Sequence, residues 1–302
     1  MQNTPPLKIK TITDGHKVAG LAKPNHPLIS LVDVSQFKSH TAVTSVIFDF
    51  YVISLKRGCD NLIYGQQKYD FDEGLMAFMA PGQILRGESG APPPNLTGWM
   101  LFIHPDFLWN TSLASKIKNY DFFNYAANEA LFLSEKEEIT INGIVENIRQ
   151  EYHANIDTFS QEIIISQIET LLNYAQRFYN RQFITRKKTN HQILEQLETI
   201  LNHYFEDENI ISKGLPTVQY VSDKLNLSPS YLRGLLTSLT GLSTQQHIHE
   251  KLLSKAKEKL STTQLSVSEI AYQLGFEHPQ SFSKLFKTKT LVSPLEFRER
   301  FN

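Results

Sequence analysis

The sequence has few of the features that mark secreted or membrane proteins. Its 302 residues include one cysteine, Cys59, so no disulfide can form within the chain. The most apolar run, residues 41–55, carries Asp49 at its centre and is too short to cross a bilayer as a helix. Residues 1–15 lack the apolar segment of a secretory signal. We expect a cytoplasmic protein with no membrane partner.

An excess of one charge is missing as well. The formal net charge is -1, and a basic surface can be present in a nearly neutral chain, so the total identifies no partner. The length favours two domains, each able to bury a core of its own.

Motifs of enzyme active sites are also scarce. The chain has no Gly-rich phosphate loop and no nucleophile elbow. A catalytic metal needs about three converging protein ligands, whereas His40 and His104 lie far apart in the sequence. His247 and His249 would face different directions on a helix, because they are two residues apart. We expect no catalytic residue, no metal and no cofactor.

Residues 35–106 are rich in Val, Ile, Phe and Tyr and are divided by turn signals such as "APGQ" and "GAPPPNLTG". This pattern predicts a compact all-β unit, closed as a barrel or stacked as a sandwich to hide strand edges. His40 is the candidate for an effector contact, against a hydrogen-bonded structural role. Cys59 could sense oxidants or be an ordinary loop residue. Six aromatic residues could line a ligand cavity, but we interpret them as core: Phe48, Phe50, Tyr51, Phe71, Phe78 and Trp99.

Helical patterns follow the β-rich region. Ser134 and Glu137 match a capping box, which predicts a helix start. In a later helix, apolar residues recur at three- and four-residue steps from Ile164 to Tyr179. This stripe either packs on the β unit or pairs with its copy in a two-fold dimer. We favour a dimer, formed by Ile164, Ile168, Leu171, Leu172 and Ala175.

The segment "ITRKKTNHQ", residues 184–192, interrupts the apolar rhythm. We interpret it as a linker between domain 1–183 and domain 193–302. Its basic trio, Arg186 to Lys188, is interpreted as solvated linker, with phosphate contact as the alternative.

An internal repeat occupies the last third of the chain. The stretch "TVQYVSDKLNLSPSYLRGLLTSLTGLS" from Thr217 aligns with "SVSEIAYQLGFEHPQSFSKLFKTKTLVS" from Ser266. After a one-residue insertion, Leu232 corresponds to Phe282 and Leu236 to Phe286. Each copy predicts a short helix, a tight turn and a second helix opened by a proline, which is the pattern of a helix-turn-helix.

The second helix of such a unit can lie in the DNA major groove while the first crosses the backbone. The two units span residues 217–237 and 267–287, and the text between them predicts one continuous helix that opens with a capping box at Ser243 and Gln246. Two rigidly joined units suit successive major grooves roughly 34 Å apart.

The segment from about Ile193 to Phe301 resembles the DNA-binding domain of the AraC/XylS family of bacterial transcription regulators. The most specific part of the resemblance is "SVSEIAYQLGF…FSKLFK…VSPLEFR". The resemblance implies that "PSYLRGLL" and "PQSFSKLF" are recognition helices. The residues implied to face bases are Ser230, Arg233, Gln280, Ser281 and Lys284, and those implied to meet the DNA backbone are Tyr231 and Lys287.

Two positions depart from the family pattern. Gly234 stands where many relatives carry a long polar side chain, so the first recognition helix is expected to read fewer bases. Leu291 replaces a common glycine, which puts the local turn geometry in doubt.

The front half resembles, more loosely, the cupin-like barrel of regulators in this family. We therefore expect an α+β chain with a cupin-like β-barrel, a helical dimerisation segment and an all-α double helix-turn-helix domain. The resemblance implies an effector-responsive transcription activator whose partners are promoter DNA, RNA polymerase, a small-molecule effector and a second copy. The alternatives are a small-molecule-binding or enzymatic cupin whose tail mediates protein contacts, and a regulator that needs no ligand.

Overall fold

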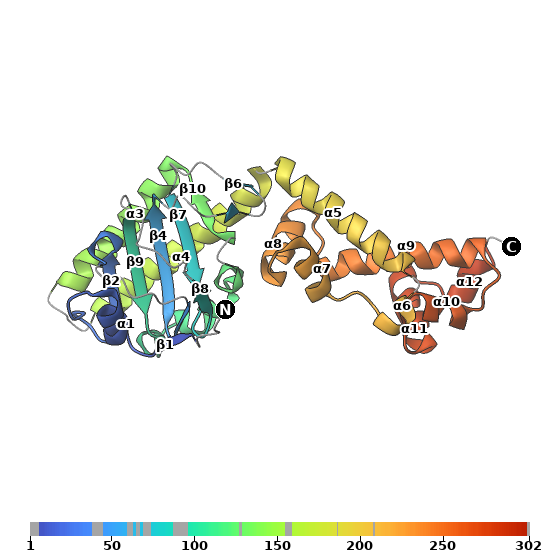
Figure 1. Cartoon of the computed structure of the whole chain (residues 1–302), viewed down its shortest axis with the longest axis horizontal. Helices are drawn as coiled ribbons and strands as arrows, with labels where there is room; N and C mark the ends of the chain where they lie inside the picture. Colours follow the sequence, from blue (N-terminus) through green and yellow to red (C-terminus); the bar gives the residue numbers. More distant parts are fainter. Residues whose placement is uncertain are drawn as a thin grey trace, which may run out of the picture. The chain divides into compact units, whose positions relative to one another are not determined.

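The computed structural model divides into two compact units, residues 1–185 and 186–302, which are described one at a time (Figure 1). It describes residues 6–37, 45–58, 63–64, 67–68, 74–86, 96–126, 129–154, 159–185, 187–207 and 209–300. Within those ranges, no helix is both long and apolar enough to span a bilayer.

Unit 1 is built on β-strands that pair into sheets of five, three and two strands. The strands are β1 (Leu7–Ile9), β2 (Ile29–Asp33), β3 (Ser45–Phe48), β4 (Tyr51–Arg57), β5 (Ile63–Tyr64), β6 (Gln67–Lys68), β7 (Gly74–Met79), β8 (Ile84–Arg86), β9 (Thr97–Ile103) and β10 (Leu131–Leu133). The largest sheet is antiparallel in the order β10-β7-β4-β9-β2, and β1-β3-β8 form the three-stranded sheet.

The five-stranded sheet is apolar on both faces, so its strands show long apolar runs. Val52 pairs with Met79 and Phe102 in register, and all three pack in a cluster with residues of the three-stranded sheet. The neighbouring pair of Ile53 and Phe78 points to the opposite face, where the Phe78 ring meets Tyr179, 6.2 Å between centroids. One face is thus covered by a second sheet and the other by helices.

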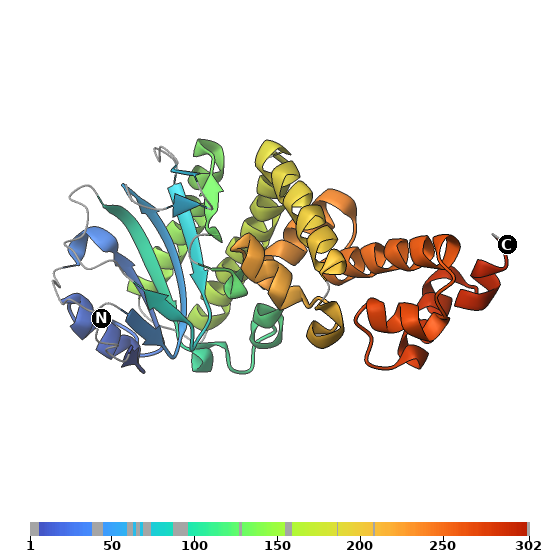
Figure 2. The same cartoon turned by 45° about the vertical axis from the view of Figure 1, so that its right-hand side comes forward.

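The helices of unit 1 are α1 (Ile12–Ala19), α2 (Leu113–Lys116), α3 (Glu135–His153) and α4 (Ser160–Thr185). Figures 1 and 2 show α3 and α4 side by side against one face of the large sheet. The capping box of Ser134 and Glu137 is confirmed at the start of α3.

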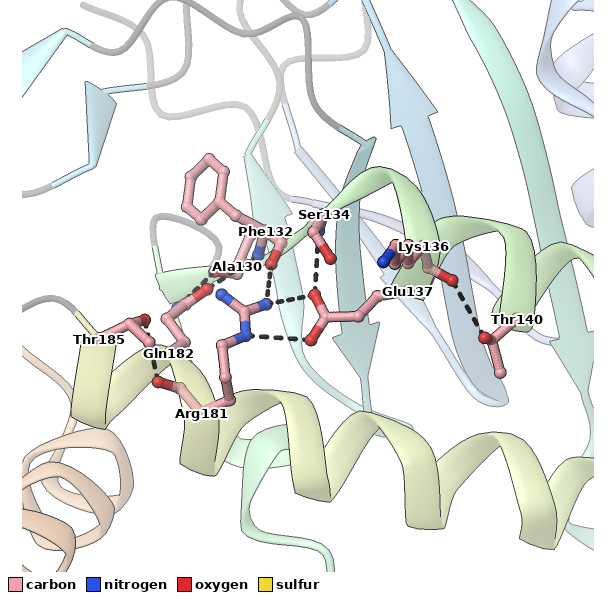
Figure 3. A network of polar contacts seen from close by, with 9 residues as sticks. All are labelled: Ala130, Phe132, Ser134, Lys136, Glu137, Thr140, Arg181, Gln182 and Thr185. Atoms are coloured by element: carbon pink, nitrogen blue, oxygen red, sulfur yellow. Dashed lines mark hydrogen bonds and ion pairs between the residues drawn. The ribbon is translucent and has the colours of Figure 1, made fainter.

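A polar network joins the start of α3 to the end of α4 (Figure 3). Arg181 donates two hydrogen bonds to the carboxylate of Glu137, at 3.0 and 2.6 Å, and a third to the carbonyl of Phe132 at 2.7 Å. Gln182 is fully buried and bonds both Phe132 and Ala130. These contacts fix the last turns of α4 against β10.

The expected core is confirmed for five of the six aromatic residues, which are 9 % exposed or less: Phe48, Phe50, Tyr51, Phe78 and Trp99. Phe71 lies outside the described residues. The division into a β-rich front and an all-helical tail is also confirmed. The cupin-like barrel remains a prediction, because the pairings among the described strands leave three separate sheets.

Unit 2 is all helical. Its helices are α5 (Lys187–Glu206), α6 (Ile210–Lys213), α7 (Val218–Leu225), α8 (Pro229–Thr240), α9 (Thr244–Thr262), α10 (Val267–Gln273), α11 (Pro279–Thr290) and α12 (Pro294–Arg298). The two units meet between Thr185 and Arg186, inside the segment predicted as a linker at residues 184–192. Most of that segment is helical rather than extended, because α4 runs to Thr185 and α5 begins at Lys187. A run of polar residues does not by itself end a helix, since lysine, glutamine and arginine favour helix.

Candidate nucleic-acid interface

The first helix-turn-helix consists of α7 and α8. Thr217 caps α7 by accepting the N–H of Tyr220, and the helix ends at Asn226, whose φ of 54° is left-handed. Ser228 then caps α8 by accepting the N–H of Tyr231, with Pro229 at the first helical position. The chain therefore stops one helix and starts the next within a few residues.

The second helix-turn-helix consists of α10 and α11, and it is built with the same kinds of cap and turn. Ser266 and Glu269 form a capping box, and the bonds from Ser266 hold the pKa of Glu269 below its ordinary value. The turn passes through Gly275 at φ 87°, where an added Cβ would lie 2.6 Å from the carbonyl oxygen of Gly214. Only glycine suits both the left-handed backbone and the close approach.

Two pairs of equivalent positions in the two copies of the sequence repeat are buried to the same extent. Leu232 and Leu236 of α8 are fully buried, and their counterparts Phe282 and Phe286 of α11 are at most 1 % exposed. Each second helix therefore turns the same face inward, and the face opposite is left for solvent or a partner.

One continuous helix, α9, connects the two helix-turn-helix motifs within unit 2 (Figure 2). Its 19 residues span about 28 Å at 1.5 Å per residue. The predicted capping box of Ser243 and Gln246 is confirmed at its start, and Ile248, Leu252, Ala256 and Leu260 are buried along one side. The spacing between the two helix-turn-helix units is thus set by a rigid, packed element.

The outer face of α8 carries Ser230, half-buried, and Arg233, exposed. Gly234 adds no side chain to this face, where its counterpart in the repeat is Lys284. Arg233 is the single charged residue of α8.

The outer face of α11 is richer in hydrogen-bonding groups and charge. Gln280, Ser281, Lys284 and Lys287 are all exposed, and their spacing places them on one side of the helix. The helix contains Lys289 as a third cation and no acidic residue. Arginine, lysine and glutamine match the acceptor and donor groups of guanine and adenine edges, and lysines also meet phosphates.

The predicted DNA contact of Tyr231 is wrong. Its side chain is 2 % exposed, because Tyr231 lies one turn before Leu235 on the inward face of α8. The sequence comparison with the second unit hides this, since the corresponding residue there is the exposed Ser281.

Sequence reasoning also missed two exposed hydroxyl residues on the outer faces. Thr237 lies two turns after Ser230 on α8, and Thr288 lies one turn after Lys284 on α11. Helical spacing alone predicts the exposed side for both threonines, because residues seven or eight positions after a base-facing residue share its side of the helix.

The predicted dimer surface is wrong as well. Ile168, Leu171, Leu172 and Ala175 are fully buried within unit 1, and Ile164 is 4 % exposed. The stripe packs against α3 and β10 of its own chain. An apolar stripe has the same pattern whether a sheet or a second copy covers it.

Other candidates for chemistry do not gather into a site. His40 and Cys59 lie outside the described residues. His247 meets the Thr240 hydroxyl at 2.9 Å while His249 meets Gln245 at 3.0 Å, so the two rings have different neighbours. Among residues that the structure describes, no group of three or more His, Cys, Asp or Glu side chains could hold a metal.

Comparison with known proteins points to the helical unit. A family profile described as a helix-turn-helix domain matches residues 221–300. The Msm operon regulatory protein of Streptococcus mutans is 35% identical over 82 residues, 27% of this chain and 30% of that protein. The HTH-type transcriptional activator RhaS of Enterobacter sp. strain 638 is 30% identical over 140 residues, 46% of each.

Among solved structures, the C-terminal domain of the two-component response regulator yesN from Fusobacterium nucleatum is 32% identical. The match covers 33% of this chain and 96% of that domain, with a TM-score of 0.29. The chain spans less than half the length of the curated relatives that it matches first. The doubled helix-turn-helix and these relatives together show that residues 221–300 form a helix-turn-helix domain similar to that of AraC-type transcription regulators.

Proposed function

We propose that the chain binds double-stranded DNA at specific sequences and thereby regulates transcription from the cytoplasm. The observation that carries this proposal is the pair of outward-facing helices, α8 and α11, held apart by the packed helix α9. The similarity to RhaS, described as a transcriptional activator, favours activation, with contact to RNA polymerase.

The two helices contribute unequally in this proposal. α11 offers Gln280, Ser281 and Lys284 to base edges and Lys287 to the backbone, whereas α8 offers Ser230 and Arg233. Specificity therefore depends mainly on α11, since Gly234 gives α8 no side chain that could contact a base at the position equivalent to Lys284.

The distribution of charge supports DNA as the partner. Residues 186–302 contain 15 Lys and Arg against 12 Asp and Glu, although the whole chain is nearly neutral. The acidic excess belongs to unit 1, so the potential around unit 2 is more positive than the total suggests. Unit 1 is proposed to hold the effector and to bias DNA binding through a change in population.

The test is to incubate the purified full chain with fragmented DNA from its source organism and to sequence the retained fragments. We expect a shared motif with two elements about one helical turn apart. Binding to a retained fragment should weaken steeply with salt, because phosphate contacts release counterions. The double variant Arg233→Ala, Lys284→Ala should lose retention.

The matched control is Lys136→Ala, which removes an exposed positive charge from α3 in unit 1. This variant should retain the same fragments as the unmodified chain. Retention that depends on neither Arg233 nor Lys284 would contradict the proposal, and would favour a tail that mediates protein contacts.

A further inference from the structure

Unit 1 contains a pocket beside β2, the strand at one edge of the large sheet. It is lined by the chain entering β2, by the 3-10 helix at Pro105–Leu108 with the turn after it, and by the end of α3 and the start of α4. Its volume is about 590 Å³, which lies in the range of small-molecule sites.

The pocket has an apolar floor and an aromatic rim. Ile29, Phe107 and Ile164 are each 5 % exposed or less and form part of its wall. Trp109 is 75 % exposed at the same site, an unusual exposure for the largest apolar side chain. A ligand that covers this indole would remove apolar surface from water.

Hydrogen bonds between distant segments hold the walls in place. Gln161 donates through Nε2 to the carbonyl of Phe107 at 2.7 Å, which ties α4 to the 3-10 helix. The Tyr152 hydroxyl accepts the N–H of Asn25 at 2.8 Å, which ties α3 to the segment before β2. The pocket is therefore formed without a ligand, and binding does not have to order it.

The charged groups of the pocket are all acidic. Asp106 and Glu151 line it, and no lysine or arginine does. Among the described residues, neither carboxylate has an ion pair with a lysine or arginine. Tyr152 and His26 also line the pocket, and Nδ1 of His104 lies 3.5 Å from the Asp106 carboxylate. His26 accepts the N–H of Leu28 at Nδ1, and burial lowers its pKa, which favours the uncharged ring.

We propose that this pocket binds a small organic cation, an ammonium or guanidinium group attached to an apolar body. The cation pairs with the carboxylate of Asp106 or of Glu151, because charge-assisted hydrogen bonds are strong. The apolar body packs on Phe107 and Trp109, whose rings also attract a cation. The use of such a ligand as an effector depends on the proposed DNA-binding function, whereas the binding itself does not.

The main competitor is an anion. The first turn of α4 lies at the pocket, and a helix start favours negative charge. Two full carboxylate charges oppose this partial charge, so the balance in the pocket favours a cation. The sign of the bound charge is therefore the quantity to measure.

The experiment is calorimetric titration of the full chain with three probes of one shape: 2-phenylethylammonium, 2-phenylethanol and 3-phenylpropionate. We expect the ammonium to bind and the carboxylate to give no heat of binding. In Asp106→Asn and Glu151→Gln, the affinity for the ammonium should fall about tenfold or more, as for loss of a charged hydrogen bond. The control Glu146→Gln, on α3 outside the pocket, should bind like the unmodified chain.

Each variant is first melted without ligand to verify that unit 1 is folded. Equal binding of carboxylate and ammonium, no binding of the ammonium, or affinity that ignores both pocket substitutions would overturn the proposal. Retention of DNA fragments is measured separately. Ammonium binding with no DNA retention would refute the proposed function and leave the cation site standing.

Discussion

Lys284 and Gly234 stand at equivalent positions of α11 and α8, the two proposed recognition helices. The difference between these two residues is expected to make the two helices contribute unequally to DNA reading. Both positions lie on the outer face, and only α11 has a side chain there that reaches outward. Removal of Lys284 is therefore the sharpest test of base reading at the residue scale.

Lys284→Ala should cost roughly 1 to 3 kcal/mol of binding free energy and relax the preference at one base pair, if the side chain reads a base. The measurement is affinity for a retained site and for its single-base variants at fixed salt. Equal weakening on every sequence would mark Lys284 as a phosphate contact instead.

Leu291 ends α11 in a left-handed conformation, with φ 66° and a side chain that is 84 % exposed. The left-handed region costs an L-residue about 1 kcal/mol or more, and the exposed leucine offers little burial in return. Leu291→Gly should raise the free energy of unfolding by about 1 kcal/mol. Urea unfolding of the full chain measures this change.

The control for that prediction is Asn226→Gly at the turn after α7, where φ is 54°. Asparagine tolerates the left-handed region, so this substitution should gain less. A loss of stability in Leu291→Gly would show that the leucine stabilises the turn by a contact despite its exposure.

At the scale of elements, α4 is the helix whose role changed most between sequence and structure. Its apolar stripe covers the chain's own sheet, and Arg181 and Gln182 fasten its end to β10. Substitutions in the stripe should therefore change stability rather than association.

Leu171→Ala should lower the free energy of unfolding by about 2 to 5 kcal/mol, because Leu171 is fully buried. The neighbouring Thr170→Ala, on the exposed side of α4, should change it by about 0.5 kcal/mol or less. Denaturant unfolding and mass in solution are measured together. A halved mass with unchanged stability would restore the stripe as a dimer surface.

At the scale of the whole molecule, a drop in pH should lower the free energy of unfolding of both units. Burial lowers the pKa of His26 in unit 1 and of His247 and His249 in unit 2. Unfolded histidines titrate near about 6.5, so below that pH the unfolded chain binds more protons than the folded chain. The contribution of these uncharged histidines to the free energy of unfolding should be fully present above about pH 7 and should fall as the pH drops through about 6.5.

The measurement is the melting temperature of the full chain from pH 8 to pH 5. The double variant His247→Gln, His249→Gln should show a shallower fall, compared after matching both proteins at pH 8. An identical slope in the variant would show that these two histidines do not couple protonation to folding.

The sequence by itself determined the helical half of this protein to a large extent. Asn226 and Gly275 mark the turns, Ser228, Ser243 and Ser266 cap helices, and the caps and turns are in place in the structure. These caps and turns depend on residues close together in the chain, so they can be predicted from local sequence. The doubled helix-turn-helix could therefore be predicted.

Only the tertiary structure decided which surfaces are covered. The sequence did not show that Tyr231 faces inward, that the stripe of α4 meets its own sheet, or that the segments of Asp106 and Glu151 line one pocket. Burial and pockets arise from segments far apart in the sequence, and periodicity identifies an apolar face without identifying what packs against it.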